Sequence, residues 1–364
     1  MKILYVITGL NIGGAEQIVR QLAYNFAKEG HHVTILILSS HPINVPYSDK
    51  IEIISLNFSK NIFLIPLLIF NFFEVIRKVN PDIVHSHMYH SNIFARLTRI
   101  FLKIPILIST AHSNNEGGGF RMFMYRITNF LSDAFTNVSQ DAINEFENKG
   151  AVSKHKMIKI YNGINLDLFT KNDNLERNID IKNPIFLSVG SLTKLKDHKN
   201  LINAFYILTK EVEGARLIIA GDGPLKNNLL KLTTSLNLTS KISFIGISND
   251  IPNLMKQADI FVLSSTHEGF GLVIAEAMAS KLLVIATNCG GSKEVIGDCG
   301  FLVPTKNSSS LAEAMKIALN IPANEKIKRQ NLGRKRVIEN FDFNNIFKQW
   351  EALYISNFNN LNNA

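Results

Sequence analysis

The segment Asp259-Ile-Phe-Val-Leu-Ser-Ser-Thr-His-Glu-Gly-Phe-Gly-Leu-Val-Ile-Ala-Glu-Ala-Met278 holds the pattern on which the fold prediction depends. Its apolar run at 260–263 is typical of a buried strand. A second apolar set, at 270, 273, 274, 277 and 278, has the spacing of a helix that packs one face on a sheet. We therefore expect a helix from near Phe270, with Glu268 in the turn before it and Glu276 in its second turn, off the apolar face.

The same succession of strand, turn and helix recurs along the chain. Apolar strand-like runs fall at 2–8, 33–38, 83–84, 106–109, 134–138, 185–189, 217–220, 242–244, 260–263 and 282–286, with helix-like stretches between them. Such a β-α-β series is typical of parallel sheets covered by helices. A stretch rich in Asn, Asp and Lys interrupts the series after residue 166. The sequence therefore predicts an α/β protein with two Rossmann-like doubly wound domains.

The chain has 364 residues, which is long for a single hydrophobic core. We expect a first domain at 1–166, a linker at 167–183 and a second domain at 184–340. We expect residues 341–364 to form a C-terminal helix that packs back on the first domain, followed by an Asn-rich tail.

The composition is that of a globular protein, with 46% hydrophobic and 19% charged residues. The two cysteines, Cys289 and Cys299, belong to no CxxC pair and no Cys/His cluster, so they predict small buried side chains. A chain without a disulfide framework fits a reducing compartment, and we expect a cytoplasmic protein.

The net charge of the chain is +9, and the positive excess is locally uneven. Between 54 and 131 the basic residues are Lys60, Arg77, Lys78, Arg96, Arg99, Lys103, Arg121 and Arg126, and the acidic ones are Glu74, Asp82 and Glu116. The apolar run at 62–70 is too short to cross a membrane and contains Pro66. These features favour peripheral contact with an anionic membrane, at the inner face of the plasma membrane, or with an anionic lipid substrate. The alternative is a set of buried helices with solvated basic edges.

Nucleic acid is not expected as a partner, because no basic stripe or nucleic-acid motif accompanies the charge.

Ligands of open parallel sheets bind at the carboxyl ends of strands, and three strand-to-helix turns here have unusual chemistry. The first, Thr8–Glu16, contains Gly13 and Gly14, which allow a close backbone approach, and a helix start near Ala15 that favours phosphate. It lacks the GxGxxG pattern, and no acid follows the second strand, so a nicotinamide cofactor is not expected. The alternative is that the glycines only close a tight turn.

The second turn, Gly190–Lys199, carries Lys194, Lys196 and Lys199 between a strand and a helix. Such a loop can hold a diphosphate. A solvated basic loop is the competing interpretation.

The third turn is the opening segment, with its two glutamates. An ionised carboxylate only accepts hydrogen bonds and suits a vicinal diol, whereas the helix start suits phosphate. A nucleotide sugar combines both features; the alternatives are two exposed carboxylates and paired-carboxylate hydrolysis, which needs the acids on opposite sides of the scissile bond. No Asp-x-Asp, GxSxG or P-loop pattern occurs, so we expect no metal and no cofactor.

The stretch Glu268-Gly-Phe-Gly-Leu-Val-Ile-Ala-Glu276 resembles the E-x7-E signature of the retaining GT-B glycosyltransferases of family 4. Further matches follow in that family's order, from about residue 3 to 303. They are Ile12-Gly-Gly-Ala-Glu16, Pro81-Asp-Ile-Val-His-Ser-His87, Thr110-Ala-His112, Tyr161-Asn-Gly-Ile-Asn165, Val189-Gly-Ser-Leu192 with Lys196, Ala220-Gly-Asp-Gly-Pro224, Phe244-Ile-Gly246 and Ala286-Thr-Asn-Cys-Gly-Gly-Ser-Lys-Glu294.

This resemblance implies two Rossmann-like domains facing across a cleft, with the acceptor mainly on the first domain and the nucleotide-sugar donor mainly on the second. Glu276 would hold the ribose hydroxyls, and Glu268 would contact the transferred sugar. The remaining site residues that it implies are the backbone N–H groups of Phe270, Gly271 and Leu272 at the sugar and diphosphate, Gly13 and Gly14 over the phosphate, and His112 beside the transferred sugar.

One position departs from the family pattern: Ser191 stands where an Arg is common. The cationic clamp on the diphosphate is then reduced to Lys196, unless Lys194 or Lys199 compensates. Because stabilisation of the leaving group is the main electrostatic contribution to such a reaction, Ser191 is a doubtful diphosphate position.

The resemblance further implies transfer with retention through front-face substitution, in which the departing phosphate takes the acceptor proton and no metal is required. We expect a UDP-sugar donor and a lipid-linked saccharide acceptor, in the synthesis of bacterial O-antigen, capsule or lipopolysaccharide. A nucleotide-sugar epimerase and a non-catalytic nucleotide-sugar-binding protein are the alternatives.

Overall fold

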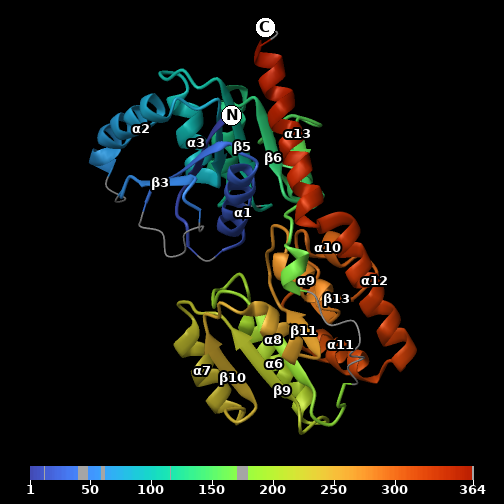
Figure 1. The fold of residues 1–364 in the computed structure, drawn as a ribbon. Helices are drawn as coiled ribbons and strands as arrows, with labels where there is room; N and C mark the ends of the chain where they lie inside the picture. The colour runs from blue at the N-terminus through green and yellow to red at the C-terminus, as the bar shows by residue number, and fades with distance from the viewer. Residues whose placement is uncertain (12, 40–47, 59–61, 115, 170–178, 363–364) are drawn as a thin grey trace. The chain divides into compact units, whose positions relative to one another are not determined.

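The structure is a computed structural model that describes all residues except 12, 40–47, 59–61, 115, 170–178 and 363–364. The chain forms two compact units (Figure 1): Met1–Gly163 with Asn344–Ala364, and Ile164–Phe343. Most of the predicted linker, at 170–178, lies outside the described residues, as does Ile12 of the glycine turn.

The first unit is built on a seven-stranded parallel sheet with the order β3-β2-β1-β4-β5-β6-β7. Its strands are β1 Lys2–Ile7, β2 His32–Ile37, β3 Ile51–Ser55, β4 Ile83–His87, β5 Ile106–Ala111, β6 Ala134–Asn137 and β7 Met157–Lys159. Its helices are α1 Gly14–Lys28, η1 Ile62–Leu64, α2 Ile65–Val79, α3 Tyr89–Thr98, α4 Gly119–Thr128, η2 Asn129–Leu131, α5 Gln140–Asn148 and α13 Phe343–Asn362, whose first residue belongs to the second unit.

The second unit contains a six-stranded parallel sheet with the order β10-β9-β8-β11-β12-β13. Its strands are β8 Ile185–Val189, β9 Arg216–Ala220, β10 Ile242–Gly246, β11 Ile260–Leu263, β12 Leu283–Thr287 and β13 Phe301–Val303. Its helices are η3 Leu166–Phe169, α6 His198–Thr209, α7 Lys226–Ser235, α8 Ile251–Gln257, α9 Leu272–Ala279, α10 Ser292–Ile296, α11 Ser308–Asn320 and α12 Ala323–Phe341.

The two sheets confirm the predicted architecture of two doubly wound α/β domains. In each, the first strand of the unit lies inside the sheet, and the chain winds outward from it in both directions. Helix α1 buries the predicted apolar stripe, whose members are Ile18, Val19, Leu22, Ala23, Phe26 and Ala27. The carboxyl ends of β8, β11 and β12, which are neighbours in the second sheet, therefore bring their three following turns to one edge.

The C-terminal helix α13 packs on the first unit (Figure 1, red). The Tyr354 hydroxyl lies 2.6 Å from Nδ1 of His85, and the Tyr354 ring stacks on Phe26 with 4.8 Å between centroids. The ring of Trp350 lies 4.8 Å from that of His85. This segment, distant in sequence, thus supplies part of the wall behind strand β4.

The helices of the first unit expose many large apolar side chains. Helix α2 buries Leu68, Phe72, Val75 and Ile76 against the sheet, yet Leu64, Ile65, Leu67, Ile69 and Phe70 in and just before its first turns are exposed. Helix α2 is therefore buried on one face and exposes apolar side chains on another. Among the described residues, no helix is long and apolar enough to cross a membrane.

Candidate functional site

Glu268 lies in the turn between β11 and α9, where it is almost completely buried, with 8% of its surface exposed. Its Oε1 accepts hydrogen bonds from the Ser265 hydroxyl at 2.6 Å and from the Lys196 ammonium at 2.5 Å. A buried carboxylate is costly unless it is paired and hydrogen-bonded, so these two donors explain how the turn holds a charge at this edge of the sheet. The interpretation of Glu268 as a merely exposed residue is wrong.

Lys196 reaches Glu268 because two loops are held together by hydrogen bonds to backbone carbonyls. The Ser264 hydroxyl donates a hydrogen bond to the Lys196 carbonyl, 2.9 Å away. The Thr266 N–H donates one to the Leu195 carbonyl, 2.7 Å away. The other predicted cations of the loop, Lys194 and Lys199, are exposed, as is Ser191. Lys196 is therefore the lysine of this loop that the fold brings to Glu268.

A third turn, after β12, presses against the backbone of Glu268. Gly290 has φ +52, and a Cβ there would lie 1.7 Å from the Glu268 carbonyl oxygen. A Cβ on Gly291 would lie 2.6 Å from the Gly269 oxygen. The two glycines are needed for this close approach of backbone to backbone. Sequence reasoning did not assign them this role, although two adjacent glycines after a strand indicate such an approach.

Glu276 is also buried, with 6% of its surface exposed. The expectation that it lies off the apolar face of an amphipathic helix is wrong, because α9 is buried all round except at Val273. The helix begins at Leu272, two residues later than expected, with Gly271 at φ +92 before it. Phe270 is instead an anchor that packs edge-on against Phe341, 5.2 Å between centroids.

The start of α9 gives this edge a partial positive charge. The first N–H groups of a helix have no partner within the helix and can bind an anion. The N–H groups of Phe270, Gly271 and Leu272 lie at this start, between the two buried glutamates in sequence. The second unit thus combines acceptors for hydroxyl groups with donors for an anion.

In the first unit, Gly13 precedes α1, which begins at Gly14. A Cβ on Gly13 would lie 2.3 Å from Oε2 of Glu16, so that carboxylate already lies over the helix start. Burial raises the pKa of Glu16, partly offset by its backbone hydrogen bond and by nearby Arg20. Sequence reasoning placed Glu16 in this turn but gave no role to it or to Arg20, although an acid in the first turn of a helix is a signal for Glu16.

Three histidines gather at the carboxyl edge of the first sheet. His85 and His87 are the buried third and fifth residues of β4, and His112 follows β5. Nδ1 of His87 lies 3.0 Å from Nε2 of His112, and the rings of His85 and His87 are 4.0 Å apart. Burial lowers the pKa of His112 to about 4 and that of His87 well below its usual value.

The backbone of His112 is fixed by a buried acid that sequence reasoning also missed. The His112 N–H donates to Oε1 of Glu116 at 3.0 Å, and the Tyr125 hydroxyl donates to Oε2 of the same residue. Burial raises the pKa of Glu116 despite these bonds. No sequence pattern pointed to Glu116, because its partners come from a neighbouring strand end and from α4.

Of the predicted site residues, the structure joins Lys196 to Glu268 and places Glu276 and the start of α9 on the same turn-plus-helix segment. Gly13, Gly14 and His112 belong to the first unit. No group of three or more His, Cys, Asp or Glu suited to a metal occurs among the residues that the structure describes.

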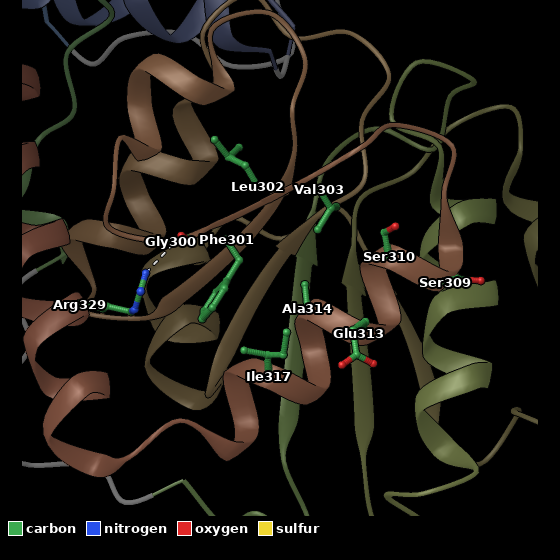
Figure 2. A pocket seen from close by; sticks show the side chains of 10 residues that line it. All are labelled: Gly300, Phe301, Leu302, Val303, Ser309, Ser310, Glu313, Ala314, Ile317 and Arg329. Carbon is green, nitrogen blue, oxygen red and sulfur yellow. Dashed lines mark hydrogen bonds between the residues drawn. The ribbon is translucent and has the colours of Figure 1, made fainter.

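A surface groove of about 700 Å³ runs along the edge strand β13 (Figure 2). Its lining includes Phe301, Glu313 and Arg329, and the Arg329 guanidinium stacks over the Phe301 ring at 5.0 Å. The lining of this groove contains none of the predicted site residues, and neither Glu268 nor Glu276 belongs to it.

Comparisons with known proteins agree with this arrangement. The glycosyl transferases group 1 model matches residues 170–336, and the glycosyltransferase family 4 model matches residues 12–168. N-acetyl-alpha-D-glucosaminyl L-malate synthase of Bacillus anthracis is 30% identical over 298 residues, 77% of this chain and 76% of the relative. UDP-Gal:alpha-D-GlcNAc-diphosphoundecaprenol alpha-1,3-galactosyltransferase of Escherichia coli is 25% identical and covers 86% of this chain and 87% of its own.

Among solved structures, a glycosyltransferase from Rickettsia africae is 26% identical, with a TM-score of 0.80 and 98% of both chains covered. This likeness confirms the predicted GT-B fold class. Two family models cover the two halves of the chain, and relatives match most of its length. The chain therefore belongs to the group 1, family 4 glycosyltransferases.

Proposed function

We propose that this enzyme transfers a sugar from a UDP-sugar to a lipid-linked saccharide, with retention of the anomeric configuration, in bacterial surface-polysaccharide synthesis. The observation that carries the proposal is the Lys196–Glu268 pair beside the start of α9 and buried Glu276. One sheet edge thus holds acceptors for two sugars and donors for the diphosphate that joins them.

In this proposal Glu276 binds the ribose hydroxyls and Glu268 contacts the transferred sugar. Lys196 and the N–H groups of Phe270, Gly271 and Leu272 stabilise the diphosphate. An ammonium has three donors, so the bond to Glu268 leaves Lys196 able to bind phosphate as well. Gly13 and Gly14 close over the phosphate, and His112 lies beside the transferred sugar.

The reaction that suits these groups is a front-face substitution. The bond between the anomeric carbon and the phosphate oxygen breaks, and the acceptor oxygen bonds to the same face of that carbon. The leaving phosphate oxygen takes the acceptor proton, while Lys196 and the helix start stabilise its charge. Glu268, held by Ser265 and Lys196, stabilises the positive sugar and is not the general base.

The relatives support the substrate classes. The printed name of the Escherichia coli relative contains a UDP-sugar and a diphosphoundecaprenol-linked acceptor. The name of the Bacillus anthracis relative contains L-malate, which favours a small soluble acceptor as a second candidate.

Peripheral contact with an anionic membrane fits the surface of the first unit. Phe120, Phe123, Ile127 and Phe130 follow one another at intervals of three or four residues along α4 and η2, and all four are exposed. Glu116 is the one acid between 88 and 131, and its carboxylate is bound to His112 and Tyr125. An apolar stripe among basic residues suits the interface of an anionic leaflet.

The function is tested by thermal shifts with UDP-, GDP- and ADP-sugars, followed by transfer assays with undecaprenyl diphosphate-linked saccharides and with L-malate. We expect the UDP-sugar to stabilise the protein and its sugar to reach the lipid-linked acceptor as the retained anomer. Inversion would refute the retaining mechanism. Epimerised sugar formed without an acceptor would favour the epimerase, and binding without turnover would favour a non-catalytic protein.

A further inference from the structure

The residue that follows Lys196 has an unusual backbone conformation. Asp197 lies in the left-handed region, at φ +44 and ψ +48, and α6 begins directly after it. The residue before a helix usually has extended backbone angles. Two other left-handed residues of this unit, Asn237 and Lys281, follow the ends of α7 and α9, where this conformation is common. The start of α6 does not by itself explain the conformation of Asp197.

The carboxylate of Asp197 contributes little as a cap of α6. Its Oδ1 accepts a hydrogen bond from the Asn200 N–H at 3.3 Å, but the same N–H donates to the Asp197 carbonyl at 3.0 Å. The bond to Oδ1 is therefore long and shared, and a serine would cap the helix as well. What an aspartate adds is tolerance of left-handed angles, which glycine, asparagine and aspartate adopt more readily than other residues.

The segment before Asp197 is tied to the acidic turn. The two preceding carbonyls accept the hydrogen bonds at 2.9 and 2.7 Å from the turn after β11. The Lys196 stem passes over Gly190, because a Cβ on that glycine would lie 3.6 Å from Cδ and Cε of the lysine. These contacts direct the ammonium to Oε1 of Glu268, 2.5 Å away.

The segment after Asp197 is tied to the core. Helix α6 contributes completely buried side chains to the core of the second unit: Leu201, Ile202, Ala204, Phe205 and Leu208. Moving the helix would expose this apolar surface, which is costly. A residue at 197 that disfavours left-handed angles would therefore displace the loop, and Lys196 with it.

The neighbouring histidine cannot replace a displaced Lys196. His198 is buried, and burial together with the Lys196 charge lowers its pKa to about 4. Its ring is therefore neutral near pH 7 and adds no cation at this end of the loop.

We propose that Asp197 is a positioning residue, whose left-handed conformation directs the Lys196 ammonium to Glu268 and to the diphosphate of the donor. The part that concerns the diphosphate rests on the proposed function, whereas the contact between Lys196 and Glu268 is a feature of the structure. The backbone conformation of Asp197 carries this role, and its carboxylate does not. Strain that the surrounding structure maintains is frequent at functional sites.

Two variants separate the conformation from the cap. Asp197→Gly keeps the left-handed angles and loses the cap, whereas Asp197→Ser keeps a cap and disfavours those angles. In both backgrounds and in the wild type, urea unfolding of Lys196→Met, Glu268→Gln and their combination gives the coupling between the two side chains. We expect wild-type coupling with glycine and a large loss of coupling with serine. Equal coupling in all three backgrounds, or coupling kept with serine and lost with glycine, would overturn the proposal.

Calorimetric titration of UDP gives a second readout. We expect Asp197→Ser to bind UDP about tenfold more weakly than the wild type, because the charged contact with the diphosphate is weakened. Asp197→Gly and Asp197→Asn should bind nearly as tightly as the wild type. Asn237→Ser is the matched control for strain, because Asn237 is also left-handed, at φ +56, and lies after α7.

The loss should depend on the lysine. In a Lys196→Met background, Asp197→Ser should weaken UDP binding no further, because no ammonium remains to be directed. A tenfold loss that persists in that background, or equal losses in the serine and glycine variants, would contradict a role through Lys196. Wild-type protein that does not bind UDP would refute the proposed function instead, and the unfolding experiment would still decide whether Asp197 positions Lys196.

Discussion

Nζ of Lys196 lies 2.5 Å from Oε1 of Glu268, although 72 positions separate the two residues in the chain. The pair joins the cation expected at the diphosphate to the carboxylate expected at the transferred sugar. It forms because the strands that precede them, β8 and β11, are neighbours in the sheet. The chemistry of either group therefore depends on the other.

Removing the ammonium should affect both stability and turnover. Lys196→Met leaves Glu268 buried without its counter-charge, so we expect the free energy of unfolding to fall by about 1–3 kcal/mol. We also expect kcat to fall by at least about 100-fold, the usual effect of removing one group that stabilises the developing charge. Urea unfolding and transfer rates measure these effects. Lys194→Met, at an exposed position of the same loop, is the control, and equal behaviour of the two variants would contradict this role.

Gly290 should tolerate no side chain. Gly290→Ala places a methyl group where the Glu268 carbonyl lies, at 1.7 Å, and also imposes φ +52 on an alanine. Gly246→Ala is a matched control, because its φ is +72 but no atom lies within 4 Å of its Cβ. We expect the control to lose about 1 kcal/mol of stability from backbone strain alone, and Gly290→Ala to lose more and to lose turnover. Similar losses in the two variants would show that the contact with Glu268 is unimportant.

The proposed membrane contact of the first unit should depend on the exposed apolar stripe along α4 and η2. Phe120→Ser with Phe123→Ser removes two of its exposed rings, and we expect weaker co-sedimentation with anionic vesicles at low salt. Ile247→Ser, exposed in the second unit, is the control. Transfer to a soluble acceptor should be unchanged. Wild-type protein that fails to bind anionic vesicles would refute the contact.

The buried histidines should make stability depend on pH. The pKa values of His112 and His198 are lowered from 6.5 to about 4, so the unfolded chain binds more protons between these values. Their contribution to the free energy of unfolding is complete above about pH 6.5 and is lost as the pH falls toward 4. The free energy of unfolding then changes by up to about 1.4 kcal/mol per pH unit for each histidine. Denaturant unfolding at pH 7, 6 and 5 measures it. His112→Gln should reduce the slope, and a stability that stays constant from pH 7 to 5 would show that these rings are not buried as neutral groups.

The fold was largely predictable from the sequence because parallel strands buried on both faces appear as apolar runs. The strands that the sequence did not predict, β3, β7 and β13, lie at sheet edges or have only three residues, so their apolar signal is short. The polarity of α9 was also mispredicted. Glu276 was expected off the apolar face of the helix, whereas the structure covers nearly the whole helix.

The site was predictable in its residue types but not in its pairings. Glycines and glutamates after the ends of strands indicated candidate ligand sites, because open parallel sheets bind ligands at the carboxyl ends of their strands. The contact of Lys196 with Glu268 and that of His87 with His112 depend on which strands are adjacent, and local pattern does not contain that information. No sequence pattern pointed to Glu116, because its role depends on the hydrogen bonds that its carboxylate accepts from the His112 N–H and the Tyr125 hydroxyl.

The division of work between the two glutamates is tested most directly by calorimetric titration of UDP, which contains the ribose and the diphosphate but no transferred sugar. Glu276→Ala should bind UDP at least about 100-fold more weakly than the wild type, a loss of about 2.7 kcal/mol. Glu268→Ala should bind UDP at least as well as the wild type, because Lys196 is freed for the diphosphate, and should lose turnover instead. Wild-type affinity for UDP in Glu276→Ala, or a loss of UDP binding in Glu268→Ala with normal turnover, would contradict the account.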